Sequence, residues 1–64
     1  MYTREQTIAM LEDAAVLITE DGAYRIGWID NEEGIVYLTD EDDGDEVAMP
    51  IKDIDLSQPD VLLY

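Results

Sequence analysis

Six carboxylates crowd into the seven residues from Asp40 to Glu46, within the stretch TDEDDGDEV. Carboxylates at this density could hold a hard cation such as Ca²⁺, act as a hydrolytic pair, or present a negative surface to a basic partner. A solvated hairpin turn is the fourth interpretation, because Asp43-Gly44 is a strong turn dipeptide and exposed charges cost little there. The rest of the chain helps to choose among them.

The spacing does not fit a calcium loop. An EF-hand loop needs oxygen ligands at fixed offsets around a glycine at position 6 and a bidentate glutamate at position 12. With Gly44 at position 6, position 1 falls on Thr39 and position 12 on Pro50. We therefore expect no dedicated metal ligands and no cofactor, and the remaining alternative is weak association of Ca²⁺ or Mg²⁺ with the many carboxylates.

The chain also lacks the side chains that most enzymes use. It has no histidine for proton transfer near neutral pH and no cysteine nucleophile, and its only serine, Ser57, has no histidine to activate it. Two carboxylates can hydrolyse glycosides, but only in a cleft that raises one pKa, which 64 residues can hardly build around a sugar. We expect no catalytic residues and no enzymatic activity.

Charge is the strongest feature of the composition. Seventeen acidic residues against three basic ones give a formal net charge of −14. Such a chain repels nucleic acid and anionic lipid, because binding phosphates requires clustered Lys and Arg. A hydrophobic content of 47% is nevertheless too high for an acidic disordered tail. We expect a folded protein that does not bind DNA or RNA directly.

Nothing in the sequence suggests a membrane protein. No apolar run approaches the roughly 20 residues of a membrane-spanning helix, and the start MYTREQ has neither the basic beginning nor the apolar centre of a signal peptide. The expectation is a soluble, cytoplasmic protein.

The first segment is predicted to be a helix from about Arg4 to Thr19. Thr3 and Gln6 have capping-box spacing, apolar residues then recur at helical intervals, and Gly22 is a plausible stop. Residues 16–19 are rich in β-branched side chains and could instead begin a strand. That strand would turn back through the residues EDG.

From Ala23 the apolar period becomes two, which predicts an antiparallel meander over YRIGWID, IVYLT and EVAMPI. Tyr24, Ile26 and Trp28 should point one way, as should Val47, Met49 and Ile51, and VLLY should add a fourth strand or an apolar tail. The predicted fold for residues 1–64 is a single small α+β domain. It consists of one N-terminal helix packed on an antiparallel sheet of three to four strands, loosely similar in shape to small SH3-like barrels.

Acidic residues dominate the second half of the chain, where twelve of the seventeen lie between Asp30 and Asp60. Residues two apart on a strand lie roughly 6.6 Å apart on one face, so acids at the turns of a sheet can resemble spaced phosphates. We expect the partner-binding surface to comprise the acids of the two visible turns: Asp30, Glu32, Glu33, Asp40, Glu41, Asp42, Asp43, Asp45 and Glu46.

In size and charge alone the chain resembles the small, very acidic phage-encoded inhibitors of DNA glycosylases, restriction enzymes and CRISPR effectors. The resemblance implies an inhibitor that mimics nucleic-acid phosphates and blocks a basic nucleic-acid-binding protein or enzyme. No residue motif carries it, so it implies no individual functional residue. One alternative is a non-catalytic interaction or regulatory module with a basic protein partner, and another is a domain adapted to high salt.

Aromatic residues divide into two groups. Trp28 and Tyr37 lie in alternating segments and are expected in the core or half-buried. Tyr2 and Tyr64 lie near the chain ends and, with Leu62 and Leu63, could form an apolar patch that recruits a partner or a second copy as a homodimer. In such an interface we expect the carboxylates to steer association and the aromatics to hold the complex.

Overall fold

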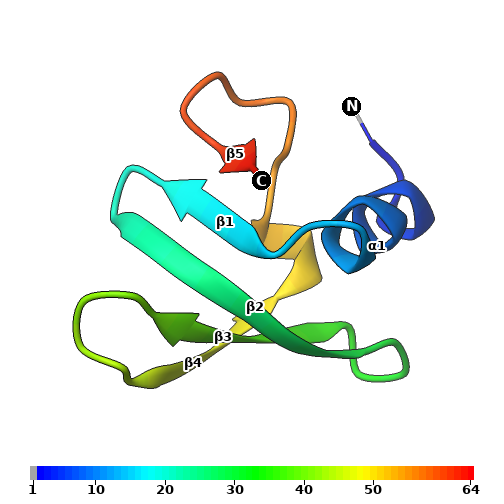
Figure 1. Cartoon of the computed structure of the whole chain (residues 1–64). Helices are drawn as coiled ribbons and strands as arrows, with labels where there is room; N and C mark the ends of the chain where they lie inside the picture. Colours follow the sequence, from blue (N-terminus) through cyan, green and yellow to red (C-terminus); the bar gives the residue numbers. More distant parts are fainter. Residues whose placement is uncertain (1) are drawn as a thin grey trace.

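The computed structural model describes residues 2–64. One helix precedes five strands, which form an antiparallel sheet in the order β4-β3-β2-β1-β5 (Figure 1). The elements are α1 (Arg4–Glu12), β1 (Val16–Thr19), β2 (Gly22–Asp30), β3 (Ile35–Asp40), β4 (Glu46–Pro50), the 3-10 turn η1 (Ile51–Asp53) and β5 (Leu62–Leu63). The predicted α+β class is confirmed, although the sheet gains a strand over the number expected. The SH3-like shape stays a prediction.

The start of α1 is determined locally. The Thr3 hydroxyl accepts from the Gln6 N–H at 3.1 Å, and the Gln6 side-chain oxygen accepts from the Thr3 N–H at 2.9 Å. This reciprocal pair is the predicted capping box, which satisfies backbone donors that a helix leaves unpaired. Two turns later Leu11 is fully buried and joins the core. Among residues 2–64 there is no helix with the length and apolar character needed to cross a membrane.

The predicted extension of the helix to Thr19 is wrong, and the strand alternative is the observed one. Residues 16–19 form β1, which pairs with β2 on one side and with β5 on the other. The strand places Leu17 fully inside the core. β-Branched residues fit such a paired, half-buried position better than a helix end. Gly22, at φ +141°, therefore begins β2 instead of ending the helix.

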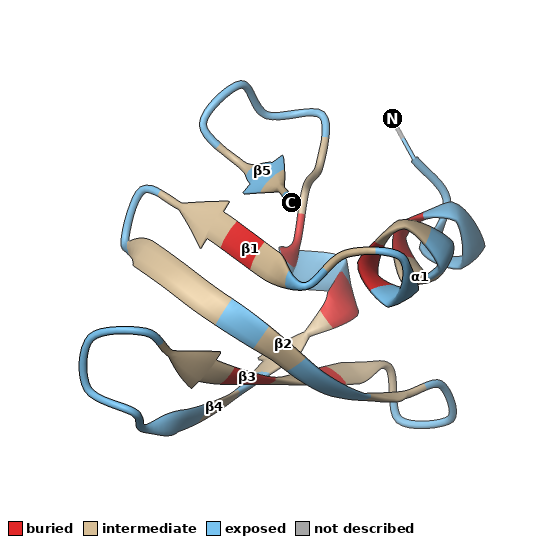
Figure 2. Ribbon diagram, in the orientation of Figure 1, coloured by how far each residue is buried: buried red, intermediate tan, exposed pale blue. Residues whose placement is uncertain are grey.

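The core lies on one face of the sheet, beneath α1 and η1. Its buried residues come from α1, β1, β3 and the segment after β4 (Figure 2): Leu11, Leu17, Val36, Leu38, Ile51 and Ile54. Val47 and Met49 pack against this core from β4, as the alternation predicted. In β5, Leu63 packs inward opposite Leu17, while Leu62 is exposed.

A β-bulge changes the expected pattern of β2. Ile26 pairs with Leu38 and Ile29 with Val36, so two residues of β2 face a single residue of β3. Both isoleucines consequently reach the core, together with Tyr24. The intervening Trp28 is turned to the opposite face and is 62% exposed. The predicted core or half-core position of Trp28 is therefore wrong, because an extra residue reverses the alternation.

Candidate functional site

The turn between β3 and β4 is built around Asp40. Its carboxylate accepts from the backbone N–H groups of Asp42 at 2.8 Å and Asp43 at 3.3 Å, and its carbonyl oxygen accepts from the Gly44 N–H at 2.8 Å. Gly44 has φ +77°, a conformation that favours glycine. The Glu41 N–H donates to the Ala23 carbonyl oxygen at 3.1 Å, which fastens the turn to β2. The acidic run is thus an ordered turn.

The turn between β2 and β3 repeats this construction. The Asp30 carboxylate accepts from the N–H groups of Glu32 at 3.1 Å and Glu33 at 3.0 Å, and its carbonyl oxygen accepts from the Gly34 N–H at 2.9 Å. Gly34 has φ +71°. DNEEG and DEDDG are therefore the same turn, with an aspartate and a glycine four positions apart. The first aspartate of each shapes the backbone, and the acids that follow it remain exposed.

The structure does not bring the two acidic turns together. β3 runs from one turn to the other, and its six residues at about 3.3 Å each span roughly 20 Å. Successive turns of an antiparallel meander always fall at opposite ends of the sheet, and Figure 1 shows the β2–β3 turn on the side of α1, away from the β3–β4 turn. The nine predicted binding residues are consequently two separate groups, with Asp30, Glu32 and Glu33 at one end and the other six at the opposite end.

The β3–β4 turn shares its end of the sheet with the turn between β1 and β2. β2 begins between them, since Ala23 pairs with Ile18 and Tyr24 pairs with Asp40. This turn adds Glu20 and Asp21, both exposed. We call the following seven exposed carboxylates the acidic end: Glu20, Asp21, Glu41, Asp42, Asp43, Asp45 and Glu46.

Glu20 and Asp21 are absent from the predicted site because the segment before them was expected to be helical. Had residues 16–19 been assigned to a strand, the EDG turn would have fallen two turns before the acidic run, and hence at the same end. The strand alternative for residues 16–19 would therefore have identified Glu20 and Asp21 from the sequence.

Little positive charge offsets the acidic end. Arg25 lies 3.8 Å from the Glu41 carboxylate, and its side chain is 72% exposed. Surface ion pairs of this kind contribute about 0–1 kcal/mol. Within residues 2–64 this is the one ion pair between side chains. The other two cations, Arg4 at the start of α1 and Lys52 in η1, line a cavity beside the β2–β3 turn, which lies at the other end of the sheet.

A groove of about 250 Å³ adjoins the β1–β2 turn, and acidic residues from the connection between β4 and β5 line it too. Five carboxylates border this groove: Glu20, Asp21, Asp53, Asp55 and Asp60. The Ser57 hydroxyl and N–H and the Gln58 side-chain amide donate to Asp55 and hold the pKa of that carboxyl below its usual value. No set of three or more acidic side chains in the described part of the chain is arranged to hold a metal ion.

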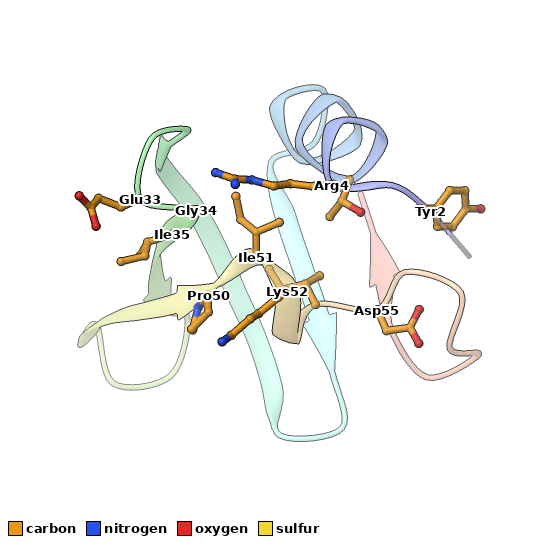
Figure 3. A pocket seen from close by; sticks show the side chains of 11 residues that line it. Tyr2, Arg4, Glu33, Gly34, Ile35, Pro50, Ile51, Lys52 and Asp55 are labelled. Atoms are coloured by element: carbon orange, nitrogen blue, oxygen red, sulfur yellow. The ribbon is translucent and has the colours of Figure 1, made fainter.

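A cavity of about 620 Å³ lies between the start of α1, the β2–β3 turn and η1 (Figure 3). Its wall carries the cations Arg4 and Lys52 together with the acids Glu33 and Asp55, so neither sign of charge dominates. The Arg4 guanidinium donates to the Asn31 carbonyl oxygen, and a Cβ on Gly34 would lie 3.1 Å from Arg4 Nη2. Arg4 therefore ties the helix to the turn, which is a structural role.

Trp28 and Tyr37 stack on the face of the sheet that is turned away from the core. Their ring centroids are 5.3 Å apart and the ring planes differ by 21°. Tyr37 is half-buried, as expected, whereas Trp28 is exposed. Tyr2, Leu62 and Tyr64 are also exposed. Leu63 does not contribute to the apolar patch predicted for the chain ends, because it packs into the core.

Comparison with protein-family models, with curated proteins and with solved structures finds no match to this chain. Proposals about its function therefore depend on its own charge and geometry.

Proposed function

We propose that this protein is an acidic, non-catalytic inhibitor that binds a basic nucleic-acid-handling protein and occupies the surface on which that protein would hold DNA or RNA phosphates. The observation that carries the proposal is the acidic end, where two neighbouring hairpin turns present seven exposed carboxylates and a single nearby cation, Arg25. A net charge of about 2 to 8 in magnitude is ordinarily enough for solubility, and this chain has −14.

The order of the acidic turn supports a mimic of fixed charges. The Asp40 side chain and the Gly44 N–H hold the backbone of the turn, so the carboxylates of Asp42 and Asp43 project from a defined loop. Less conformational freedom is then lost on binding, which favours affinity. Clustered charge of one sign also raises the association rate with an oppositely charged partner, in a manner that salt screens.

The proposal is tested by neutralising part of the acidic end at constant shape. The partner for this test is a basic protein captured from cell lysate on the immobilised wild-type chain. The variant with Asp42→Asn, Asp43→Asn, Asp45→Asn and Glu46→Gln should keep its fold, associate more slowly with that partner and show a weaker salt dependence of association. A matched control neutralises four exposed acids elsewhere: Glu5, Glu12, Glu32 and Glu33, each to Gln. The control changes net charge equally and should slow association much less.

Competition with nucleic acid decides between mimicry and ordinary binding. A labelled DNA or RNA bound to the partner should be displaced by the wild-type protein and poorly by the acidic-end variant. Undiminished binding by that variant, or a ternary complex with nucleic acid still in place, would contradict the proposal.

A second candidate is a regulatory module whose basic partner does not handle nucleic acid. The exposed Trp28–Tyr37 stack favours it, because aromatic anchors are typical of general protein interfaces. Capture of a partner without nucleic-acid activity, in the absence of any competition, would select this candidate.

A further inference from the structure

An aromatic pair is exposed on the open face of the sheet, where the core does not require it. Trp28 is the only tryptophan of the chain and is 62% exposed, although burying such a ring would add favourable apolar contact. The Tyr37 ring covers one side of the indole at a centroid distance of 5.3 Å. The exposure therefore leaves much of the other side of the indole in solvent.

Two features of the backbone maintain this exposure. The bulge between Ile26 and Ile29 turns Trp28 outward. The bulge also brings Gly27 so close to β3 that a Cβ there would lie 3.1 Å from the Tyr37 carbonyl oxygen. The backbone of β2 thus determines the outward direction of the Trp28 side chain.

The register of the sheet places one acidic residue, Glu46, near Tyr37, on the β4 side of that ring and away from Trp28. Tyr37 pairs with Ala48 on β4, and Glu46 lies two residues before Ala48, on the same face. Such diagonal cross-strand neighbours lie about 7–8 Å apart, within reach of long side chains. Arg25 shares this face and is directed to Glu41 at 3.8 Å. The small side chain of Ala48 leaves the Tyr37 side of the stack uncrowded.

We propose that the Trp28–Tyr37 stack is an anchor for an arginine side chain of a basic protein partner. This inference rests on the proposed function in that the partner is basic. A planar guanidinium can lie flat on the free indole face, whereas a lysine ammonium is a compact, strongly hydrated point charge that cannot stack in this way. The carboxylates of the acidic end attract the basic segment, and the aromatic pair selects arginine within it.

The single tryptophan makes the site directly observable. Hexa-arginine should change Trp28 emission saturably, and it should bind about two- to fivefold more tightly than hexa-lysine, as expected for an exposed cation–π contact. Both affinities should fall as salt rises, because salt screens the attraction between charges. The two affinities should fall by similar factors, because both peptides carry the same charge. The preference for arginine should persist at salt concentrations that weaken both.

Variants separate this anchor from the acidic end. Followed with labelled peptides, Trp28→Leu should lower hexa-arginine affinity to that of hexa-lysine, while Trp28→Phe, which keeps an aromatic face, should retain part of the preference. The matched change Asp42→Asn, Asp43→Asn and Asp45→Asn should weaken both peptides by similar factors and leave their ratio unchanged. Circular dichroism confirms that each variant is folded.

Equal affinity of the wild-type protein for the two peptides would overturn the arginine anchor without touching the proposed function. So would an unchanged preference in Trp28→Leu. Sedimentation showing a dimer that is lost in Trp28→Leu would assign this face to a second copy of the chain and would also overturn it. The proposed function fails on a different result, namely undiminished binding of the natural partner by the acidic-end variant.

Discussion

Asp40 and Gly44 close the acidic turn with one backbone hydrogen bond of 2.8 Å, from the Gly44 N–H to the Asp40 carbonyl oxygen. Asp30 and Gly34 make the equivalent bond at 2.9 Å at the other end of β3. The same local chemistry therefore folds both turns, and their acids differ mainly in which neighbours the sheet gives them.

Asp40 should matter for stability through its side-chain acceptor more than through its charge. Asp40→Ala removes the bonds to the Asp42 and Asp43 N–H groups and should lower the free energy of unfolding by about 1 kcal/mol. Asp40→Asn keeps a side-chain acceptor and relieves repulsion from the neighbouring carboxylates, so it should lower the free energy of unfolding by less than Asp40→Ala does. The control Asp43→Ala should stay within about 0.5 kcal/mol of the wild type. Urea denaturation measures all three, and equal effects of Asp40→Ala and Asp40→Asn would contradict the turn-cap role.

Gly44→Ala and Gly34→Ala should lower the free energy of unfolding by different amounts, although both glycines have positive φ. A Cβ on Gly44 meets nothing within 4 Å, so its cost is the left-handed conformation alone, about 1–2 kcal/mol. A Cβ on Gly34 also lies 3.1 Å from Arg4 Nη2. Gly34→Ala should therefore be more destabilising, and a double-mutant cycle with Arg4→Ala should recover the steric part. Additive effects of the two changes would show that the contact has no cost.

Gly27→Ala should disturb the aromatic stack. The new Cβ would lie 3.1 Å from the Tyr37 carbonyl oxygen, which is held within paired strands and has little room to yield. We expect a loss of about 1–3 kcal/mol, as for other overpacked positions, together with a change in the near-ultraviolet circular dichroism of Trp28. An unaltered aromatic spectrum would show that the bulge tolerates a side chain.

Salt should raise the thermal midpoint modestly, because it screens repulsion among the carboxylates. Between about 0.01 M and about 0.15 M salt the Debye length falls from roughly 30 Å to roughly 8 Å. The four-residue acidic-end variant should show a weaker salt dependence than the matched control at Glu5, Glu12, Glu32 and Glu33. A random-coil spectrum at about 0.15 M, with folding only in molar salt, would instead identify a protein adapted to high salt.

Asp55 should contribute to the way the free energy of unfolding falls at acidic pH. The Ser57 hydroxyl first, then the Ser57 N–H and the Gln58 amide, lower the pKa of Asp55 in the folded state. Its contribution is therefore complete above the unfolded pKa and is lost as pH falls through the lower folded pKa. Asp55→Asn and Ser57→Ala should each reduce the loss of stability on acidification relative to wild type, measured by urea unfolding at a series of acidic pH values. An identical pH dependence in all three proteins would contradict this role.

Much of the fold follows from local patterns. The capping box of Thr3 and Gln6 needs only residues three apart, and the alternation of Val47 and Met49 reports directly which face of β4 is buried. Predictions failed where local preferences were balanced. Residues 16–19 suit a helix end or a strand, and pairing with β2 and β5 decided for the strand.

The net charge, the lack of histidine and cysteine, and the acid-rich turns can all be read directly from the amino-acid sequence. Tertiary structure decided which of these turns are neighbours. An antiparallel sheet sends alternate turns to the same end, so Glu20 and Asp21 join the acidic run while Glu32 and Glu33 lie at the opposite end. Tertiary structure also decided that Trp28 is exposed, because one extra residue between Ile26 and Ile29 reverses the alternation. Register between strands depends on residues far apart in the chain, which no local pattern encodes.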